Sequence, residues 1–137
     1  AIENHECVAD AYCNLGIIES RKGNLAKAVN CFTTALTNDP RHIEAHYNLG
    51  SLYFEANEFR LAQLHFAIAA EVDPTFANAF FNLGLVQSIN NDLEAAIATL
   101  TKYQSLVSAS EGQHANELLQ RLKQSLSAGK PLAQSKR

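Results

Sequence analysis

The chain has 137 residues, which suits one domain, and its apolar fraction of 47 % with six glycines and three prolines indicates a folded protein. Its net charge of −3 is spread without long runs of one sign, which excludes a surface made for nucleic acid or anionic lipid. No apolar stretch approaches the roughly 18 residues of a membrane-spanning helix, and the first residues lack the regions of a signal peptide. We therefore predict a cytoplasmic protein without nucleic-acid or membrane partners. Three cysteines without CxxC spacing predict reduced thiols.

The tripeptide Asn-Leu-Gly occurs at residues 14–16, 48–50 and 82–84, each time 34 residues further along the chain. Residues 9–40 and 43–74 share nine identities, far more than chance supplies. A third copy at 77–108 keeps the tripeptide, but it has Leu100 in place of a phenylalanine and has lost the proline. The chain is therefore built from repeats, of which the third is decayed at its far end.

Within each copy the apolar residues recur at helical spacing on both sides of a short polar segment. These segments read RKGN, EANE and INND, and they predict a tight turn between two antiparallel helices. Glycine inside a helix costs about 1 kcal/mol relative to alanine, so a close approach of two helices is the better reason for it. We expect the glycine of each tripeptide to face an alanine of the partner helix. These alanines are Ala28, Ala62 and Ala96.

The dipeptide Asp-Pro ends the first two copies, at residues 39–40 and 73–74. Aspartate is a favoured N-cap residue, and proline is favoured in the first turn of a helix. We therefore expect each Asp-Pro to end one helix pair and to cap the next.

The 34-residue period with this pattern resembles the tetratricopeptide repeat (TPR) family. Both of the first two copies carry the family's preferred residues at six positions, namely Leu15, Gly16, Ala28, Phe32, Ala35 and Pro40, and Leu49, Gly50, Ala62, Phe66, Ala69 and Pro74. The resemblance implies an all-α fold, a right-handed α-solenoid of antiparallel helix pairs with three TPR motifs and about seven helices. We expect a single domain over residues 1–129, with repeats at about 9–42, 43–76 and 77–110.

The C-terminal segment has no Asn-Leu-Gly signature. Ser110 and Gln113 are spaced as a capping box, and an apolar stripe of leucines runs from Leu118 to Leu126 before Gly129. This pattern predicts a helix at about 111–128 that caps the stack of repeats, followed by a flexible tail at 130–137.

The N-terminal end is less well closed. By the same resemblance Ala11, Leu15 and Ile18 stand at positions that pack on a preceding helix pair, and we call them the first-repeat face. Residues 1–8 are too few to form a covering hairpin. Either they extend the first helix, or a larger array was cut before this chain, which begins without methionine, or another subunit covers the face.

The sequence contains no motif of a catalytic, cofactor-binding or metal site, so we predict no enzymatic activity, no cofactor and no metal. His42 and His46 are four residues apart, but no third ligand is evident and His46 stands at a packing position of the family. A packed histidine is therefore favoured. We expect Cys13 to project into the binding groove as a small residue, without a neighbour in sequence that lowers its pKa.

By resemblance, the first helices of the repeats line the concave side of the solenoid, where such proteins bind partners. The predicted partner-binding residues are Asn14, Ile17, Tyr47, Asn48, Ser51, Phe54, Asn78, Phe81, Asn82, Leu85 and Ile89. Their apolar members favour contact with apolar side chains, unless the capping helix folds back into the groove. The three asparagines form a ladder that either pairs with an extended peptide backbone or bonds locally.

We therefore predict a protein–protein interaction module, adaptor or chaperone-like, that binds an extended peptide or a helix of a partner protein. The alternative is a scaffold that self-assembles into a homo-oligomer through the first-repeat face. The architecture is also similar to that of type III secretion chaperones, although architecture alone is a weak guide to function.

One TPR subclass clamps the C-terminal carboxylate of chaperone tails with lysine, asparagine and arginine. The corresponding positions here hold Cys13, Ile17, Asn78 and Asn82, and only Asn48 matches. Without the cations the charge-assisted bonds are lost, so chaperone tail peptides are not expected as partners.

Overall fold

The computed structural model describes residues 2–129, with side chains from residue 4 onwards, and the tail predicted at 130–137 lies outside the described residues. The helices are α1 (Ile2–Arg21), α2 (Leu25–Asn38), α3 (Ile43–Glu55), α4 (Phe59–Val72), α5 (Ala77–Ile89), α6 (Leu93–Leu106), α7 (Ala109–Gly112) and α8 (Asn116–Ser127), with the 3-10 turn η1 (Gln113–Ala115) before α8. The predicted all-α class is confirmed. Between residues 2 and 129, none of the helices combines the length and hydropathy needed to cross a lipid bilayer.

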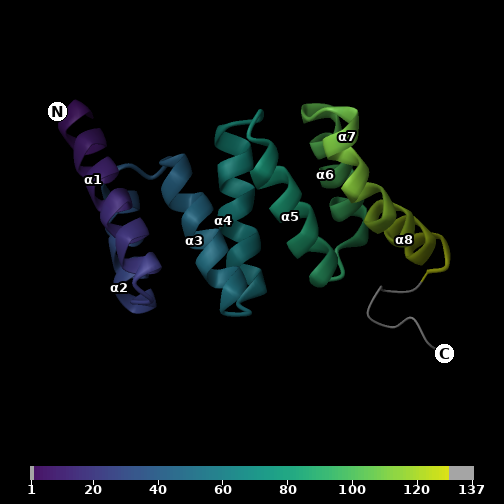
Figure 1. Ribbon diagram of the computed structural model, residues 1–137, viewed down its shortest axis with the longest axis horizontal. Coiled ribbons are helices and arrows are strands. Elements are labelled where there is room, and N and C mark those ends of the chain that lie inside the picture. The colour runs from purple at the N-terminus through teal and green to yellow at the C-terminus, as the bar shows by residue number, and fades with distance from the viewer. Residues whose placement is uncertain (1, 130–137) are drawn as a thin grey trace. The chain divides into compact units, whose positions relative to one another are not determined.

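The chain divides after Asp73 into two compact units, and each is described by itself. In the first unit α1 pairs with α2 and α3 pairs with α4, and α2 also packs on α3 (Figure 1). In the second unit α5 pairs with α6, and α8 packs on α6 (Figure 1). The expected antiparallel helix pairs are therefore present. Residues 2–8 extend the first helix, which was one of the three alternatives for the N-terminal end.

The three turns inside the helix pairs contain a residue in the left-handed region at the same repeat position. These residues are Gly23, Asn57 and Asn91, with φ of 84°, 63° and 64°. Glycine and asparagine adopt this conformation at the lowest cost, which explains why the predicted turns are short and polar.

The tripeptide glycines meet large side chains rather than the expected alanines. A Cβ added to Gly16 would lie 2.7 Å from the ring of Phe32, and one added to Gly50 would lie 2.8 Å from the ring of Phe66. At Gly84 the nearest atoms belong to Leu100, at 2.6 Å. The prediction of a glycine–alanine contact was therefore wrong in its partner. Glycine is required because the side chain at the phenylalanine position rests directly on the helix backbone.

The core of the first unit is formed by residues from three helices. They are Ala9 and Cys13 of α1, Ala28, Phe32 and Ala35 of α2, and Ala45, Leu49 and Leu52 of α3. All of them are almost fully buried, and burial of a side chain as large as phenylalanine contributes about 1.5–3 kcal/mol. This cluster explains the helical spacing of the apolar residues in the first two copies.

Asp-Pro does not cap the following helix, contrary to our expectation. Asp39 is the C-cap residue of α2, and its side chain accepts a hydrogen bond from the Arg41 backbone N–H at 3.2 Å. The N-cap of α3 is His42, whose Nδ1 accepts from the backbone N–H of Ala45 at 3.2 Å. In the second case Asp73 is the C-cap of α4, and α5 begins with Phe76 as its N-cap. Asp-Pro therefore forms the turn between two pairs.

The C-terminal segment is not one continuous helix. A capping box is present, but it joins Ser108 to Glu111 rather than Ser110 to Gln113, and it starts the single turn of α7. The predicted helix over 111–128 is interrupted by η1 and resumes as α8. Leu119 and Leu122 of α8 are buried against Leu93, Ala96 and Leu100 of α6, which is how this segment covers the third repeat.

Candidate functional site

The predicted partner-binding residues fall in both units. In the first unit Asn14 is exposed, whereas Ile17, Tyr47, Asn48, Ser51 and Phe54 are half-buried. In the second unit Asn78 and Ile89 are exposed, whereas Phe81, Asn82 and Leu85 are half-buried. Their role in binding a partner stays a prediction.

The first unit has a hollow of about 210 Å³ that is lined by residues of α1, α2 and α3. It is lined by Ile17, Ser20, Arg21, Phe32, Asn48, Ser51, Leu52 and Glu55. The hollow thus brings Ile17, Asn48 and Ser51 of the predicted set together. Phe32 and Leu52 were not in the predicted set, because their helical spacing assigns them to the packing of the helix pairs. The lining combines apolar side chains with one cation, one carboxylate and short polar groups.

Asn48 uses its side chain locally in this structure. Its Nδ2 donates to the backbone carbonyl of Glu44 at 2.8 Å, and the same side chain hydrogen-bonds to the thiol of Cys13. An amide bonded in this way is held in one orientation at the edge of the hollow. Of the two roles that the sequence left open, local bonding is the one that Asn48 has in this structure.

Cys13 does not project into the groove, contrary to expectation. Its side chain has no exposed surface and lies in the core cluster of the first unit. Burial raises the pKa of the thiol to about 11, helped by the nearby carboxylates of Glu44 and Asp10, although the hydrogen bond from Asn48 acts in the opposite direction. The thiol is therefore protonated near neutral pH and is a poor nucleophile.

Cys13, His42 and Glu44 place one potential metal-ligand atom each within 4.8 Å of one another. The imidazole of His42 is already engaged on both sides, since Nδ1 accepts from Ala45 N–H and Nε2 lies 2.6 Å from Asp10 Oδ1. An accepting Nδ1 requires the proton on Nε2, which then donates to the carboxylate. His42 has no lone pair left for a metal in this arrangement. We interpret the cluster as a helix cap tied to α1.

His46 is a packed histidine, as predicted. It is 5 % exposed, and its Nε2 donates to the carbonyl oxygen of Pro40 at 2.8 Å. Its Nδ1 must then accept from Nδ1 of His65, which lies 3.0 Å away on α4. The ring of Tyr53 stacks on that of His65, and the two ring centroids are 5.6 Å apart. Burial, and the neighbouring His46, lower the pKa of His65 to about 4, so the imidazole of His65 is neutral at pH 7.

The aromatic residues of the predicted groove make contacts inside their own units. Tyr47 meets the ring of Phe66 edge-on at 5.6 Å, and Phe54 meets Phe59 at 5.5 Å. In the second unit the ring of Phe81 lies 5.1 Å from Tyr103.

The capping segment also contacts Phe81, through His114 of η1. The two ring centroids are 5.0 Å apart, and the ring of His114 meets that of Phe81 edge-on. The C-terminal segment therefore contacts one member of the predicted partner-binding set.

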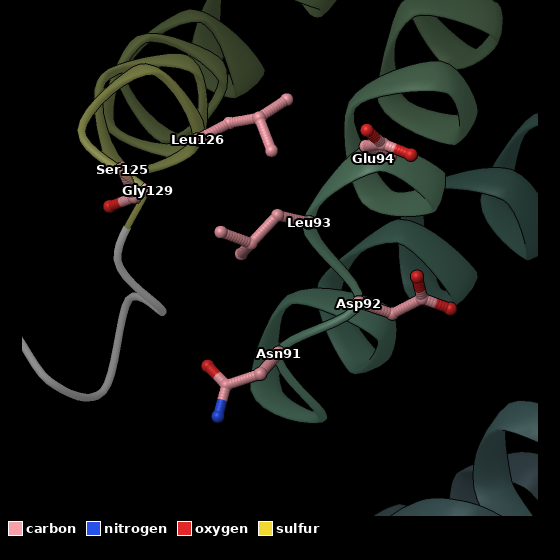
Figure 2. A pocket seen from close by; sticks show the side chains of 7 residues that line it. All are labelled: Asn91, Asp92, Leu93, Glu94, Ser125, Leu126 and Gly129. Atoms are coloured by element: carbon pink, nitrogen blue, oxygen red, sulfur yellow. The ribbon is translucent and has the colours of Figure 1, made fainter.

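A second hollow, of about 400 Å³, lies in the second unit between the start of α6 and the last turn of α8 (Figure 2). It is lined by Asn91, Asp92, Leu93, Glu94, Ser125, Leu126 and Gly129. Leu93 and Leu126 extend toward each other across it (Figure 2). No sequence pattern predicted this hollow, because it depends on where the interrupted C-terminal helix ends.

Comparison with known proteins identifies the pattern of helix pairs. Two family models, both described as tetratricopeptide repeat, match residues 9–42 and 49–112. The chain matches no curated protein.

Several solved structures are similar. The first TPR of Spaghetti (RPAP3) bound to the HSP90 peptide SRMEEVD is 20 % identical with a TM-score of 0.77, and the match covers 89 % of this chain and 95 % of that one. The N-terminal domain of stress-induced protein-1 from C. elegans is 24 % identical with a TM-score of 0.75, covering 85 % and 97 %. MamA is 26 % identical with a TM-score of 0.66, covering 72 % and 57 %.

Proposed function

Because the chain belongs to the tetratricopeptide repeat family, we propose that it is a protein–protein interaction module that holds a segment of a partner polypeptide on the inner side of its first helices. The observation that carries the proposal is the hollow of the first unit, where apolar side chains and polar groups meet in a recess of about 210 Å³. A recess of this composition suits an apolar side chain of a peptide whose backbone lies along the polar rim.

The partner is an extended peptide or a helix with apolar side chains. Half-buried Ile17 offers apolar surface, whereas Arg21 and Glu55 are charged groups of opposite sign in the same lining. Such a lining favours a segment that is apolar at one position and uncharged or mixed in charge beside it. The module acts as an adaptor or in a chaperone-like role, without catalysis. Its free thiols Cys7, Cys13 and Cys31 fit the reducing cytoplasm in which we place it.

Chaperone tails are not the partners that we propose, although the similar structure of Spaghetti contains an HSP90 peptide. That likeness, at 20 % identity, concerns the fold. In this chain the clamp position of the first repeat is occupied by Cys13, which is buried and protonated and supplies no cation. The peptide SRMEEVD is therefore a suitable negative probe.

Substitution of Ser51 tests the proposal. Peptides that bind the protein are first selected from a displayed random library, and the affinity of the best one is then measured by calorimetry for the protein and for its variants. Ser51→Arg places a long cation in the hollow and should weaken binding by roughly tenfold or more. Asn30→Arg, the same change of charge at an exposed position of α2, should leave the affinity unchanged.

Two outcomes would contradict this proposal. If Ser51→Arg and Asn30→Arg bind the selected peptide equally well, the hollow is not the binding site. If SRMEEVD binds as tightly as the selected peptide and Ser51→Arg abolishes both, the exclusion of chaperone tails is wrong. Ser51 is a better choice than Asn48 or Phe81, since these two hold Glu44 and His114 and their loss would disturb the fold.

A second candidate function is self-assembly through the first-repeat face. It is favoured by the exposure of Leu15 and Ile18, which are 42 % and 49 % exposed. Apolar residues exposed together on one helix mark an interaction surface.

A further inference from the structure

One side of α1 exposes four large apolar side chains: Val8, Tyr12, Leu15 and Ile18 are 38 %, 39 %, 42 % and 49 % exposed. The internal repeat shows what such a side can pack against. At the positions of Ala11, Leu15 and Ile18, helix α3 has Ala45, Leu49 and Leu52, and these are 0 %, 2 % and 6 % exposed. They are buried in the cluster to which α2 contributes, so in α3 the same positions pack on a helix.

Three of these exposed residues of α1, together with Ala11, have the spacing of a coiled-coil seam. Val8, Ala11, Leu15 and Ile18 follow each other at intervals of three, four and three residues, which are the a and d positions of a heptad. Asn4 continues the same alternation at the N-terminal end. Lys22 continues it just beyond the C-terminal end of the helix. The apolar stripe is therefore bounded by one polar residue and one cation on its own line.

We propose that α1 pairs with α1 of a second copy of this chain, in antiparallel orientation around a two-fold axis. The proposal rests on the second candidate function, self-assembly, and specifies its geometry. Reversing the second helix places a positions opposite d positions. Val8 then faces the partner's Ile18, Ala11 faces the partner's Leu15, and Asn4 faces the partner's Lys22.

Packing and charge favour this orientation over a parallel one. In a parallel pair Lys22 would face the partner's Lys22, and Ala11 would face the partner's Ala11 and leave a void in the seam. In the antiparallel pair a small residue faces a large one on each side of the axis, and the cation faces an amide.

The flanks of the seam are complementary in the same orientation. Glu19 stands opposite the partner's His5, a hydrogen-bond acceptor opposite a possible donor, and Tyr12 stands opposite the partner's Tyr12 across the axis. No pair of like charges faces each other along residues 4–22. A surface that is complementary to itself after a two-fold rotation is what an isologous dimer requires.

The first experiment measures the mass of the full chain by sedimentation equilibrium over a wide range of concentration. The protein should be a dimer that dissociates on dilution. Ile18→Glu should raise the dissociation constant by roughly a hundredfold, because the carboxylate would be buried without a partner. Leu64→Glu is the matched control, since Leu64 is 51 % exposed on α4 and lies outside the seam. Circular dichroism checks that both variants fold.

The second experiment tests the orientation with cysteine pairs. Cys7 and Cys31 are first replaced by serine, and Ala11→Cys or Leu15→Cys is then introduced into separate samples, one of them enlarged by a tag. In an antiparallel dimer, oxidation should cross-link the two variants when they are mixed and should cross-link neither alone. In a parallel dimer each variant would cross-link with itself.

The outcomes separate the two levels of the proposal. A protein that stays monomeric at every concentration overturns both self-assembly and the pairing of α1. A dimer that Ile18→Glu leaves intact uses another surface and overturns the pairing of α1. A dimer that Ile18→Glu dissociates, but in which each cysteine variant cross-links with itself, keeps self-assembly and overturns the antiparallel geometry.

Discussion

The helix pairs α3/α4 and α5/α6 occupy the same repeat positions but fill their interiors differently. In α3/α4, Phe66 rests on Gly50 and meets Tyr47 edge-on. In α5/α6 the corresponding residue is Leu100, which rests on Gly84. The aromatic ring of the third pair stands one turn later on the second helix, at Tyr103. The position that corresponds to Tyr103 in the earlier pair is Ala69. The third pair has therefore exchanged a phenylalanine and an alanine for a leucine and a tyrosine.

The exchange is explained by what lies beside the third pair. Tyr103 is 5 % exposed and contacts both Phe81 and His114, and its hydroxyl lies 3.2 Å from His114 Nε2. The third copy looked decayed in the sequence, because it departs from the first two. In the structure its changed residues form the contact with the capping segment. A departure from a repeat pattern near the end of an array is thus informative about the cap.

The largest effect is expected at the glycines. Alanine at position 50 would gain about 1 kcal/mol in helix propensity, but its Cβ would lie 2.8 Å from a rigid, buried ring, and overpacking costs about 1–3 kcal/mol. Because three ring atoms of Phe66 would lie 2.8–3.0 Å from the added Cβ, we expect the upper end of this cost and a net loss of about 2 kcal/mol for Gly50→Ala. Gly84→Ala should lose only about 1 kcal/mol, because Leu100 can change its rotamer.

Urea denaturation of the two alanine variants measures this difference. Adding Phe66→Leu to Gly50→Ala places an alanine against a leucine, as Gly84→Ala does in the third repeat. The second change should recover part of the stability lost in Gly50→Ala. If Gly84→Ala is the more destabilising of the two, the rigid ring is not what decides the cost.

The fold could be predicted from the sequence at positions where the backbone conformation accepts only a few residue types. The turns at Gly23, Asn57 and Asn91 are an example, since few other residues accept the left-handed region. The partner of the tripeptide glycine did not follow, because the repeat period shows which positions recur but not how deep a side chain reaches. The same holds for the candidate site. Groove positions were assigned by helical angle, and Cys13 lies at such an angle yet is buried in the core cluster of the first unit.

His42 as a helix cap could not be predicted either. An imidazole can cap a helix only in one tautomer, and that tautomer is fixed by Asp10, which is far away in sequence. Sequence reasoning had instead assigned the cap to the aspartate of Asp-Pro, whose residue type is the more common one at such a position.

A second prediction concerns pH, and again the two pairs differ. The pKa of His65 is lowered to about 4 in the folded protein, while an unfolded histidine keeps its ordinary value of about 6.5. Between these values the unfolded state binds more protons, so stability should be complete above pH 6.5 and fall as the pH drops toward 4. The third pair has Phe80 and Thr99 at the positions of His46 and His65, and therefore has no counterpart of this effect.

His65→Thr, which copies the third repeat, isolates this contribution from the titration of the carboxylates. The free energy of unfolding of the protein should fall by about 1–2 kcal/mol more than that of the variant between pH 6.5 and 4. Urea denaturation at a series of pH values provides the comparison. Parallel curves for the two proteins would show that His65 is not the group responsible.

The smallest effect is expected where the third pair meets the cap. His114→Ala removes two ring contacts, to Phe81 and Tyr103, and a part-buried hydrogen bond to the Tyr103 hydroxyl. Aromatic pairs contribute about 0.5–1.5 kcal/mol beyond their burial. We expect a loss of about 1 kcal/mol in thermal or urea unfolding, and faster amide hydrogen exchange in α8. His114→Phe should restore most of the loss, because it keeps the rings in contact without the hydrogen bond. Arg60→Ala, a change at an exposed position of α4 outside this contact, should change neither measurement. If His114→Phe is as unstable as His114→Ala, the hydrogen bond to Tyr103 rather than ring packing holds the cap, and Tyr103→Phe should then be equally destabilising.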